Sequence, residues 1–426
     1  MFIFLYHFIW TIVLAVCMPI IPLLRNERFV NRLGMNLPSD LLDDCNIWIH
    51  ALSVGEVISA VPLVKVLNLK YPDRDIVFTV TTSKGMDIAK AELKGRVKAL
   101  ITMPVDFWWS IRRIVNYIRP SFFVLVETDI WPGLISYLKG RGVTSILVNG
   151  RVSPRTFRSY QRFPVFARMM FNGLEACLMQ SDLDRDRLID IGIDKKKLKV
   201  VGNIKFDREL EPMGQDERNR WLDLMGLGSE NPIWVAGSTH KGEGLILLEV
   251  YKQLIASFPM LRLIIAPRNI EQSNDILSQA LAMGLNVLLK SQPSKNKGNW
   301  NILIIDTIGE LGRIYGLGKV SFVGGSLVPF GGHNLLEPAG FGCPVLFGPH
   351  TEDFSLMSEL LIEAGGGLLV RNGEDLYKTV GMLLEDDEIC GTMGRLAKEF
   401  VENNRGALKR VVTHIGACID RSGGLH

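Results

Sequence analysis

Short apolar runs recur along the chain at regular intervals. In the first half, β-branched and aromatic residues gather in six runs that each end in a turn or polar loop: 47–51, 76–80, 122–126, 145–148, 176–179 and 198–201. Helical patterns such as 108–118 and 182–191 lie between them. The alternation predicts βαβ units and therefore a parallel sheet.

A second series of apolar runs follows a charged stretch at 207–228. Its members are 233–236, 261–266, 302–305, 320–323, 344–347 and 367–370. We therefore predict an α/β protein with two domains of similar size, 25–210 and 211–426, a hinge near 207–215 and a cleft between the domains. Ligands of such sheets bind at the carboxyl ends of the strands, so the loops that follow the strands are the candidate sites.

The first residues form a long apolar segment. Phe2 to Leu24 carries no charge and can cross a hydrocarbon core of about 30 Å as a helix. Three arginines follow it, which predicts that the body of the protein faces the cytoplasm. We interpret 1–24 as a membrane anchor that contributes little to either core. A buried or interfacial helix is the alternative. A cleavable signal peptide fits less well, because no basic residue precedes the apolar run.

Composition excludes some classes of protein. The 48 Lys and Arg residues nearly balance the 45 Asp and Glu residues, for a net charge of +3, so a nucleic-acid-coating protein is not expected. Six scattered cysteines contain no C-x-x-C pair, which argues against a disulfide scaffold and a structural zinc site. A reducing compartment is the simplest interpretation.

Glu56 follows the first apolar run within the turn S-V-G-E. At a strand end beside a flexible turn, it is a candidate general base. The alternative is a capping box. In that motif the Ser53 side chain accepts a hydrogen bond from the Glu56 N–H, and the Glu56 side chain accepts one from the Ser53 N–H. Both interpretations can hold together.

Two further strand ends carry charged residues. The segment E-T-D-I-W-P at 127–132 offers Glu127 and Asp129 as acid/base groups, acceptors of sugar hydroxyls or metal ligands. Helix capping by Thr128 or Asp129 is the alternative, and it leaves Glu127 unexplained. Lys205 follows the run 198–201 and could offset developing negative charge, or it could be an ordinary surface lysine.

Residues 130–174 contain no acidic residue but several arginines interleaved with aromatics. Together with an upstream anchor, this pattern favours a surface that binds anionic lipid. Arginine also suits the phosphate groups of a bound ligand. A nucleic-acid surface and an ordinary solvated face are the alternatives.

Glycine-rich loops follow the strands of the second half. The segments 237–243, 324–326 and 331–338 bring glycines to predicted helix starts, where backbone N–H groups favour a phosphate. Glu337 could accept ribose hydroxyls. No G-x-x-x-x-G-K-[ST] or early G-x-G-x-x-G motif is present, so P-loop NTPases and typical NAD enzymes are not expected. The D-x-D spacing at 182–186 follows Ser181 and is typical of an acidic helix start, so we expect no metal.

The ordered motif set resembles a known family. W-I-H-A-x-S-V-G-E (48–56), E-T-D-I-W-P (127–132), N-x-R-x-S (149–153), G-N-I-K-F-D (202–207), G-S-T-H-x-G-E (237–243), P-R (267–268), D-T-I-G-E-L (306–311) and G-G-S-L with G-G-H-N-x-L-E-P (324–338) resemble 3-deoxy-D-manno-octulosonate (Kdo) transferases. The resemblance implies a GT-B fold, with two Rossmann-like domains that bind the acceptor and the nucleotide respectively. It also implies inverting, metal-independent and cofactor-free transfer of Kdo from CMP-Kdo to a lipid A precursor, at the cytoplasmic face of the bacterial inner membrane.

The resemblance assigns roles to individual positions. Glu56 matches the family's catalytic base, and Glu127 and Lys205 match groups that support the transition state. The residues that match CMP-binding segments are Arg268, Asn269, Gly309, Glu310, Leu311, Asn334, Leu335, Leu336 and Glu337. Departures from the family pattern are Asp129, Gly133, Gly244 and Asn269, where Glu, Asn, Glu and His are usual. Two other hypotheses are another membrane-associated GT-B enzyme that uses a UDP-sugar, and a non-catalytic protein that binds nucleotide sugars.

Overall fold

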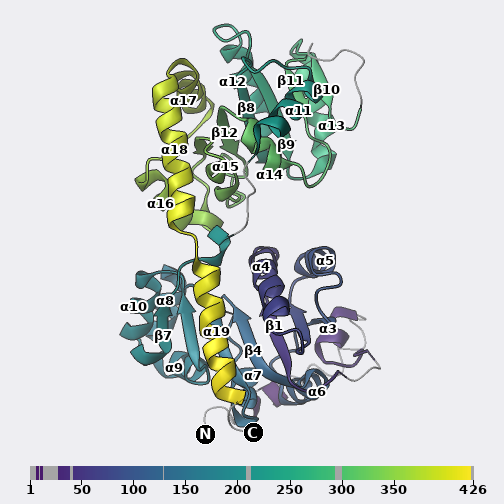
Figure 1. Cartoon of the computed structure of the whole chain (residues 1–426), viewed down its shortest axis with the longest axis vertical. Coiled ribbons are helices and arrows are strands. Elements are labelled where there is room, and N and C mark those ends of the chain that lie inside the picture. The colour runs from purple at the N-terminus through teal and green to yellow at the C-terminus, as the bar shows by residue number, and fades with distance from the viewer. Residues whose placement is uncertain are drawn as a thin grey trace. The chain divides into compact units, whose positions relative to one another are not determined.

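The computed structural model describes residues 6–8, 10–12, 27–38, 42–127, 129–207, 213–292 and 300–423. The chain divides into two compact units, Met1–Arg208 with Arg405–His426, and Glu209–Asn404. Each unit contains one seven-stranded sheet with helices on both faces (Figure 1). The prediction of two parallel α/β domains is therefore confirmed.

The first sheet has the strand order β3-β2-β1-β4-β5-β6-β7, and all of its pairings are parallel. The chain first builds outward from β1 to β3 and then continues on the other side of β1, so the order reverses between β1 and β4. Its strands are β1 (Asn46–Ala51), β2 (Ile76–Val80), β3 (Ala99–Thr102), β4 (Pro120–Val126), β5 (Thr144–Gly150), β6 (Ala176–Met179) and β7 (Leu198–Val200).

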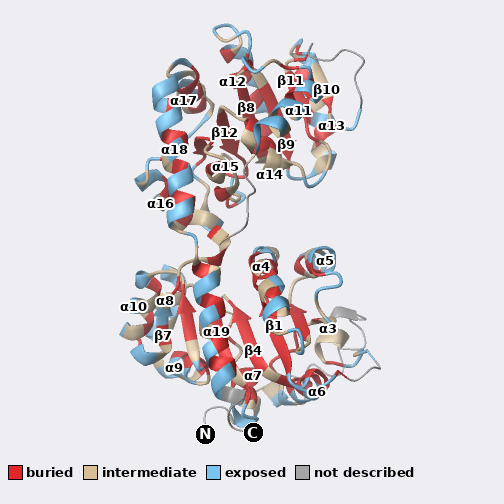
Figure 2. Ribbon diagram, in the orientation of Figure 1, coloured by how far each residue is buried: buried red, intermediate tan, exposed pale blue. Residues whose placement is uncertain are grey.

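Helices cover both faces of this sheet, which is why its strands are apolar on both sides (Figure 2). Along β1, Trp48 packs into one core while Ile47 and Ile49 pack into the other. The helices on the Trp48 side are α6 (Trp108–Ile118), α7 (Pro132–Gly140), α9 (Pro164–Asn172) and α10 (Asp182–Asp190). Those on the other side are α4 (Val54–Lys70), α5 (Ser83–Glu92) and α19 (Ala407–Gly423). The unit also contains α3 (Glu27–Arg32) and α8 (Pro154–Arg162).

The last helix, α19, belongs to the first unit. The sequence had predicted that 211–426 form one domain, so this part of the domain division is wrong. Residues Ala407, Val411 and Ile415 of α19 are fully buried in the same core as α4, beside the first sheet (Figure 1). Complete burial of a Val or Ile side chain stabilises by about 1.5–3 kcal/mol, so α19 is an integral part of the first unit. The predicted hinge near 207–215 falls mainly on residues 208–212, outside the described residues.

The second sheet has the order β10-β11-β9-β8-β12-β13-β14, again all parallel, and reverses between β8 and β12. Its strands are β8 (Ile233–Thr239), β9 (Arg262–Pro267), β10 (Val287–Leu289), β11 (Ile302–Ile304), β12 (Val320–Val323), β13 (Val345–Phe347) and β14 (Gly367–Leu369). One face is covered by α12 (Glu243–Leu254), α13 (Ser273–Ala282), α17 (Gly373–Glu385) and α18 (Asp387–Asn403). The remaining helices are α11 (Gln215–Met225), α14 (Leu311–Ile314), α15 (Leu336–Gly340) and α16 (Ser355–Glu363).

Twelve of these strands coincide with apolar runs in the sequence, and β3 and β10 were not predicted. Both lie at a sheet edge, where a strand has a single neighbour. Their sequences, A-L-I-T and V-L-L, are apolar but only four and three residues long, and so short an apolar run does not by itself distinguish a strand from part of a helix.

Most of the predicted membrane anchor lies outside the described residues. None of the helices that the structure describes is long and apolar enough to span a membrane. One part of the segment does contact the first unit, because the Tyr6 hydroxyl donates a hydrogen bond of 2.7 Å to Asp106 Oδ2. The expectation that 1–24 contributes little to either core therefore does not hold at Tyr6.

Candidate active site

The reversal point of the first sheet places two predicted site residues at one edge. Glu56 lies in the first turn of α4, directly after β1, and Glu127 directly follows β4. The carboxyl ends of these neighbouring parallel strands meet at the same edge. In doubly wound sheets, ligands bind at such a reversal point.

Glu56 is 7% exposed and holds the turn that precedes its own helix. Its Oε2 accepts a hydrogen bond from the Leu52 N–H at 2.6 Å, and its Oε1 accepts one from Ser53 Oγ at 3.1 Å. Ser53 is the N-cap residue, but its side chain caps no backbone N–H. The reciprocal capping box expected from S-x-x-E is therefore absent, because Glu56 binds the N–H of Leu52, one residue before the N-cap, rather than the N–H of Ser53.

Burial raises the pKa of Glu56 to about 7, and the negative charges of Glu127 and Asp129 add to the effect. The hydrogen bonds from Leu52 and Ser53 oppose it. A carboxylate with a pKa near neutral can both take and release a proton under cellular conditions.

Glu127 and Lys205 form an ion pair, with Lys205 Nζ 2.9 Å from Glu127 Oε1. Both side chains are partly accessible to solvent, so the pair is available to a ligand. Glu127 adopts a left-handed backbone conformation with φ of 59°, which a non-glycine residue rarely adopts. Such conformations are enriched at functional sites, where the surrounding structure holds them.

Asn149 links the two members of this pair and was given no role in the sequence analysis. It is fully buried, its Nδ2 lies 3.4 Å from Glu127 Oε1, and its Oδ1 accepts the Ile204 N–H at 3.0 Å. The amide thus joins the end of β5 to the short helical turn that carries Lys205. The motif N-x-R-x-S at 149–153 was the available signal, but sequence alone does not show what the asparagine contacts.

Asp129 has a different role from the expected helix cap. Its Oδ2 accepts a hydrogen bond from Trp131 Nε1 at 2.8 Å and lies 3.6 Å from the fully buried His50 Nε2. The cap of α7 comes from Asp106, whose carboxylate accepts the Gly133 and Leu134 N–H groups at 2.8 and 2.7 Å. Capping by Asp129 is therefore wrong, and Thr128 lies outside the described residues.

The same arrangement accounts for the departure at Gly133. A Cβ atom at this position would lie 2.7 Å from both Asp106 Oδ1 and His7 Cε1. These groups occupy the space that the asparagine usual in the family would need.

In the second unit, Glu243 ties together the loops at the reversal point between β8 and β12. It is completely buried, and its Oε2 accepts the N–H groups of His240 and Gly325, each at 2.8 Å. Its Oε1 accepts the N–H groups of Ser326 and Leu327, each at 3.0 Å. Four charge-assisted bonds to one carboxylate make these glycine-rich loops a rigid pair.

Two histidines lie above this pair of loops. The rings of His240 and His333 stack with centroids 5.0 Å apart, and His240 also stacks on Phe330 at 4.2 Å. A Cβ at Gly325 would lie 3.1 Å from the His333 ring and 3.2 Å from the His240 ring, so the rings approach the backbone closely. The glycine motifs were recognised in the sequence, whereas the histidine pair was not.

The acidic segment at 182–186 is structural. Asp184 is 3% exposed, and its carboxylate binds the Val152 N–H at 2.7 Å and Ser181 Oγ at 2.6 Å. Asp182 and Asp186 both pair with Arg185. The described residues contain no group of three or more His, Cys, Asp or Glu side chains that could hold a metal ion.

Comparison with known proteins identifies the family. The sequence model of the family described as 3-deoxy-D-manno-octulosonic-acid transferase (Kdo transferase) matches residues 26–208. A 3-deoxy-D-manno-octulosonic acid transferase of Haemophilus influenzae is 33% identical over 98% of this chain and 100% of its own length. The chain belongs to the Kdo transferase family.

Other relatives agree with this assignment. A 3-deoxy-D-manno-octulosonic acid transferase of Chlamydia pneumoniae is 28% identical over 89% of this chain and 86% of its own length. A UDP-GlcNAc 2-epimerase from Neisseria meningitidis has a similar structure, with a TM-score of 0.60 at 13% identity over 87% of this chain and 99% of its own. The fold therefore resembles that of GT-B glycosyltransferases, and this Kdo transferase family member is a glycosyltransferase.

The residues that match the family's CMP-binding segments lie on the loops and helix starts that follow strands of the second sheet. Arg268 and Asn269 follow β9, and the Arg268 N–H donates to the carbonyl of Thr239 after β8. Asn269 caps the following turn through the Glu271 N–H, so its side chain is already used locally.

The two other CMP-matching segments lie near each other. Gly309, Glu310 and Leu311 follow β11 and begin α14, where Glu310 pairs with Lys290. Leu335 and Leu336 are buried, and Asn334 Oδ1 accepts the Leu336 N–H at 3.2 Å. A Cβ at Gly312 in α14 would lie 3.9 Å from Glu337 Oε2. The segments therefore converge on one edge of the second sheet.

Proposed function

We propose that this enzyme transfers Kdo from CMP-Kdo to a phosphorylated, acylated glucosamine disaccharide, the lipid A precursor lipid IVA, with inversion and without a metal ion. The observation that carries the proposal is the buried Glu56 carboxylate at the reversal point of the first sheet, next to the Glu127–Lys205 ion pair. This set matches the needs of sugar transfer to a hydroxyl group.

A sugar hydroxyl is a poor nucleophile until a base removes its proton. Glu56 is suited to this task because its pKa is raised to about 7 by burial and by neighbouring carboxylates. A base of this strength is ionised in a large fraction of molecules at neutral pH and still binds the transferred proton well. In-line attack from the side opposite the leaving CMP would invert the anomeric configuration.

Lys205 supplies a positive charge next to the Glu127 carboxylate. Its ammonium group would stabilise negative charge that develops on the donor, since Kdo carries a carboxylate and CMP leaves as an anion. Glu127 would hold the lysine in place and accept a hydrogen bond from a substrate hydroxyl. The ion pair is partly exposed, so a ligand can reach it.

The second unit would bind CMP at the carboxyl edge of its sheet. Arg268 is exposed there, and its positive charge contributes to lowering the pKa of both His240 and His333. A monophosphate would be attracted to this positive region and to the glycine-rich loops held by Glu243. Glu337 would accept ribose hydroxyls.

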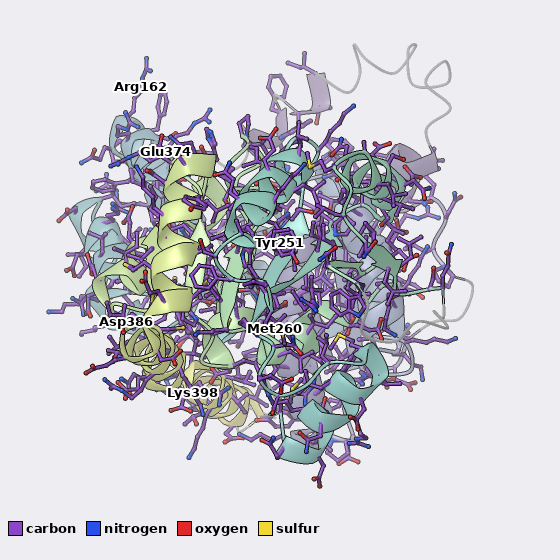
Figure 3. All side chains as sticks on the ribbon, turned by 90° about the horizontal axis from the view of Figure 1, so that it is seen from above. Arg162, Tyr251, Met260, Glu374, Asp386 and Lys398 are labelled. Atoms are coloured by element: carbon purple, nitrogen blue, oxygen red, sulfur yellow. The ribbon has the colours of Figure 1, made fainter. Side chains whose placement is uncertain are left out.

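The helix α8 and the start of α9 would contact the membrane. The α8 helix has no buried residue, and Phe163, Val165 and Phe166 are exposed at the corner between the two helices. Four exposed arginines lie on these two helices, Arg155, Arg158, Arg162 and Arg168, and Figure 3 shows the Arg162 side chain pointing away from its helix. Exposed apolar side chains among arginines suit an anionic lipid surface. We propose that the enzyme works at the cytoplasmic face of the bacterial inner membrane, with 1–24 as the anchor.

Mass analysis of reaction products tests the proposal. The purified full-length chain is incubated with lipid IVA and either CMP-Kdo or a UDP-sugar, in detergent micelles, beside a Glu56→Gln control. Addition of one or more Kdo masses from CMP-Kdo alone, lost in the control, is the expected result. Transfer from the UDP-sugar, or binding of CMP-Kdo without turnover, would contradict it.

A further inference from the structure

Asp207 connects the turn that carries Lys205 to the start of the C-terminal helix. It ends the short helical turn η2 (Ile204–Asp207), in which Lys205 lies two residues earlier. Its Oδ1 accepts the Gly406 N–H, and its Oδ2 accepts the Leu408 N–H at 2.6 Å. These two N–H groups belong to the N-terminus of α19, which lies about half the sequence away.

Asp207 replaces a cap that α19 cannot provide for itself. The first N–H groups of a helix have no partner within the helix, and the preceding residue often supplies one from its side chain. Here that residue is Gly406, which has no side chain. A carboxylate at this end is also stabilised by the helix dipole.

Additional contacts fasten the same turn. Arg410 of α19 donates from Nε to the Val201 carbonyl at 2.8 Å, and Ile204 is buried in the core that contains Ala407 and Val411. On its other side the turn is held by Asn149, which accepts the Ile204 N–H and approaches Glu127. The turn thus lies between α19 and the Glu127 site.

The position of the Lys205 ammonium depends on this turn, because η2 is only four residues long. Its carboxyl-terminal end is fixed by Asp207. We propose that Asp207 is a positioning residue that holds Lys205 against Glu127 by anchoring η2 to α19. The inference rests on the proposed function only in taking Lys205 as part of the active site.

Asp207 and Gly406 lie at the two points where the chain leaves and re-enters the first unit. The first unit ends at Arg208, next to Asp207, and resumes at Arg405, next to Gly406. Both connections between the units therefore begin beside one carboxylate.

A double-mutant cycle between Asp207→Ala and Lys205→Met tests the proposal. Asp207→Ala should lower kcat by about 10- to 100-fold, as expected for a misplaced catalytic group, with the KM for CMP-Kdo within about twofold of wild type. In the Lys205→Met background the same substitution should cause no further loss of kcat, because the group that it positions is already gone.

Asp386→Ala is the matched control. Asp386 caps α18 in the second unit through the Glu388 and Ile389 N–H groups at 3.0 and 2.9 Å, and its place is labelled in Figure 3. The Asp386→Ala substitution removes a similar helix cap in the other unit, so kcat should not change. If Asp207→Ala does not fold, Asp207→Asn, which keeps one acceptor oxygen, takes its place in the cycle.

A readout independent of turnover separates this inference from the proposed function. Acylation of Lys205 by a small reagent, followed by mass spectrometry of the peptides, should be about threefold faster in the Asp207 variant, as expected for loss of a partly exposed ion pair. The Asp386 variant should match wild type. Additive losses of kcat in the cycle, or unchanged Lys205 acylation in a folded Asp207 variant, would overturn the proposal. If the wild-type enzyme does not transfer Kdo, the proposed function is contradicted. The acylation rate of Lys205 would then decide whether Asp207 positions that side chain.

Discussion

The Nε2 atoms of His240 and His333 lie 2.8 Å apart. Only one of the two atoms can carry a proton in this contact, so the pair accommodates at most one positive charge. Burial lowers the pKa of His333 to about 4, and the charges of Arg268 and His240 act in the same direction. Burial also lowers the pKa of His240, with Arg268 contributing and Glu243 opposing.

This pair should make the enzyme less stable in mild acid. An unfolded histidine takes up a proton as pH falls through about 6.5, whereas folded His333 does so only near 4, so the free energy of unfolding should fall by about 2 kcal/mol between pH 7 and 5. Thermal unfolding measured across this range should show a smaller decrease for His333→Gln. The half-exposed His350 provides the control substitution, His350→Gln. Identical pH profiles for wild type and His333→Gln would contradict this assignment.

Glu56→Gln should lower turnover by about 100- to 10,000-fold without destabilising the fold. Wild-type activity should rise with pH and level off above about 7, where Glu56 is ionised. Because its folded pKa lies above the value of 4.5 in the unfolded chain, Glu56 contributes less to stability as pH rises through about 7. Glutamine removes this charge, so the melting temperature at pH 8 should equal or exceed that of wild type. A folded Glu56→Gln variant with normal turnover would exclude Glu56 as the base.

Lys205→Met should separate activity from stability. Removal of a charge that stabilises the transition state is expected to cost about 100-fold in kcat. The ion pair with Glu127 is partly exposed, so the free energy of unfolding should change by less than about 1 kcal/mol. Lys98→Met breaks a surface pair with Asp75 in the same unit and should leave kcat unchanged. Equal effects of the two substitutions on kcat would argue against a specific role for Lys205.

Removal of residues 1–24 should release much of the enzyme from membranes and also lower its melting temperature. The loss of stability follows from the Tyr6–Asp106 hydrogen bond, so Tyr6→Phe alone should cost about 1–2 kcal/mol. Thr11→Ala alters an exposed hydrogen bond in the same segment and should have little effect.

Residual binding of the truncated chain to anionic vesicles should weaken with salt, because surface charges are screened over about 8 Å at physiological ionic strength. Salt-independent binding of the truncated chain would contradict the basic lipid surface.

Turnover should persist in excess EDTA. Asp184, the central residue of the D-x-D segment, already binds Val152 and Ser181 in a helix cap. Initial rates measured with and without chelator should agree. A loss of turnover that Mg²⁺ or Mn²⁺ restores would show that a metal site has been overlooked.

The sequence by itself determined the two-sheet architecture and the family. Central strands of a parallel sheet are buried on both faces, so they appear as continuous apolar runs such as 122–126 that local composition reveals. The motifs at strand ends then indicated Glu56, Glu127 and Lys205, because the carboxyl ends of parallel strands share one edge. The edge strands β3 and β10 escaped prediction because their apolar runs are only four and three residues long, too short to distinguish a strand from part of a helix.

Only the tertiary structure decided which side chains share a contact. The cap of α7 comes from Asp106 rather than Asp129, the cap of α19 comes from Asp207, and α19 itself packs on the first sheet rather than the second. Each of these contacts joins residues far apart in sequence. Local propensity acts over a few residues, whereas a buried carboxylate binds whichever N–H groups the packed chain brings within about 3 Å.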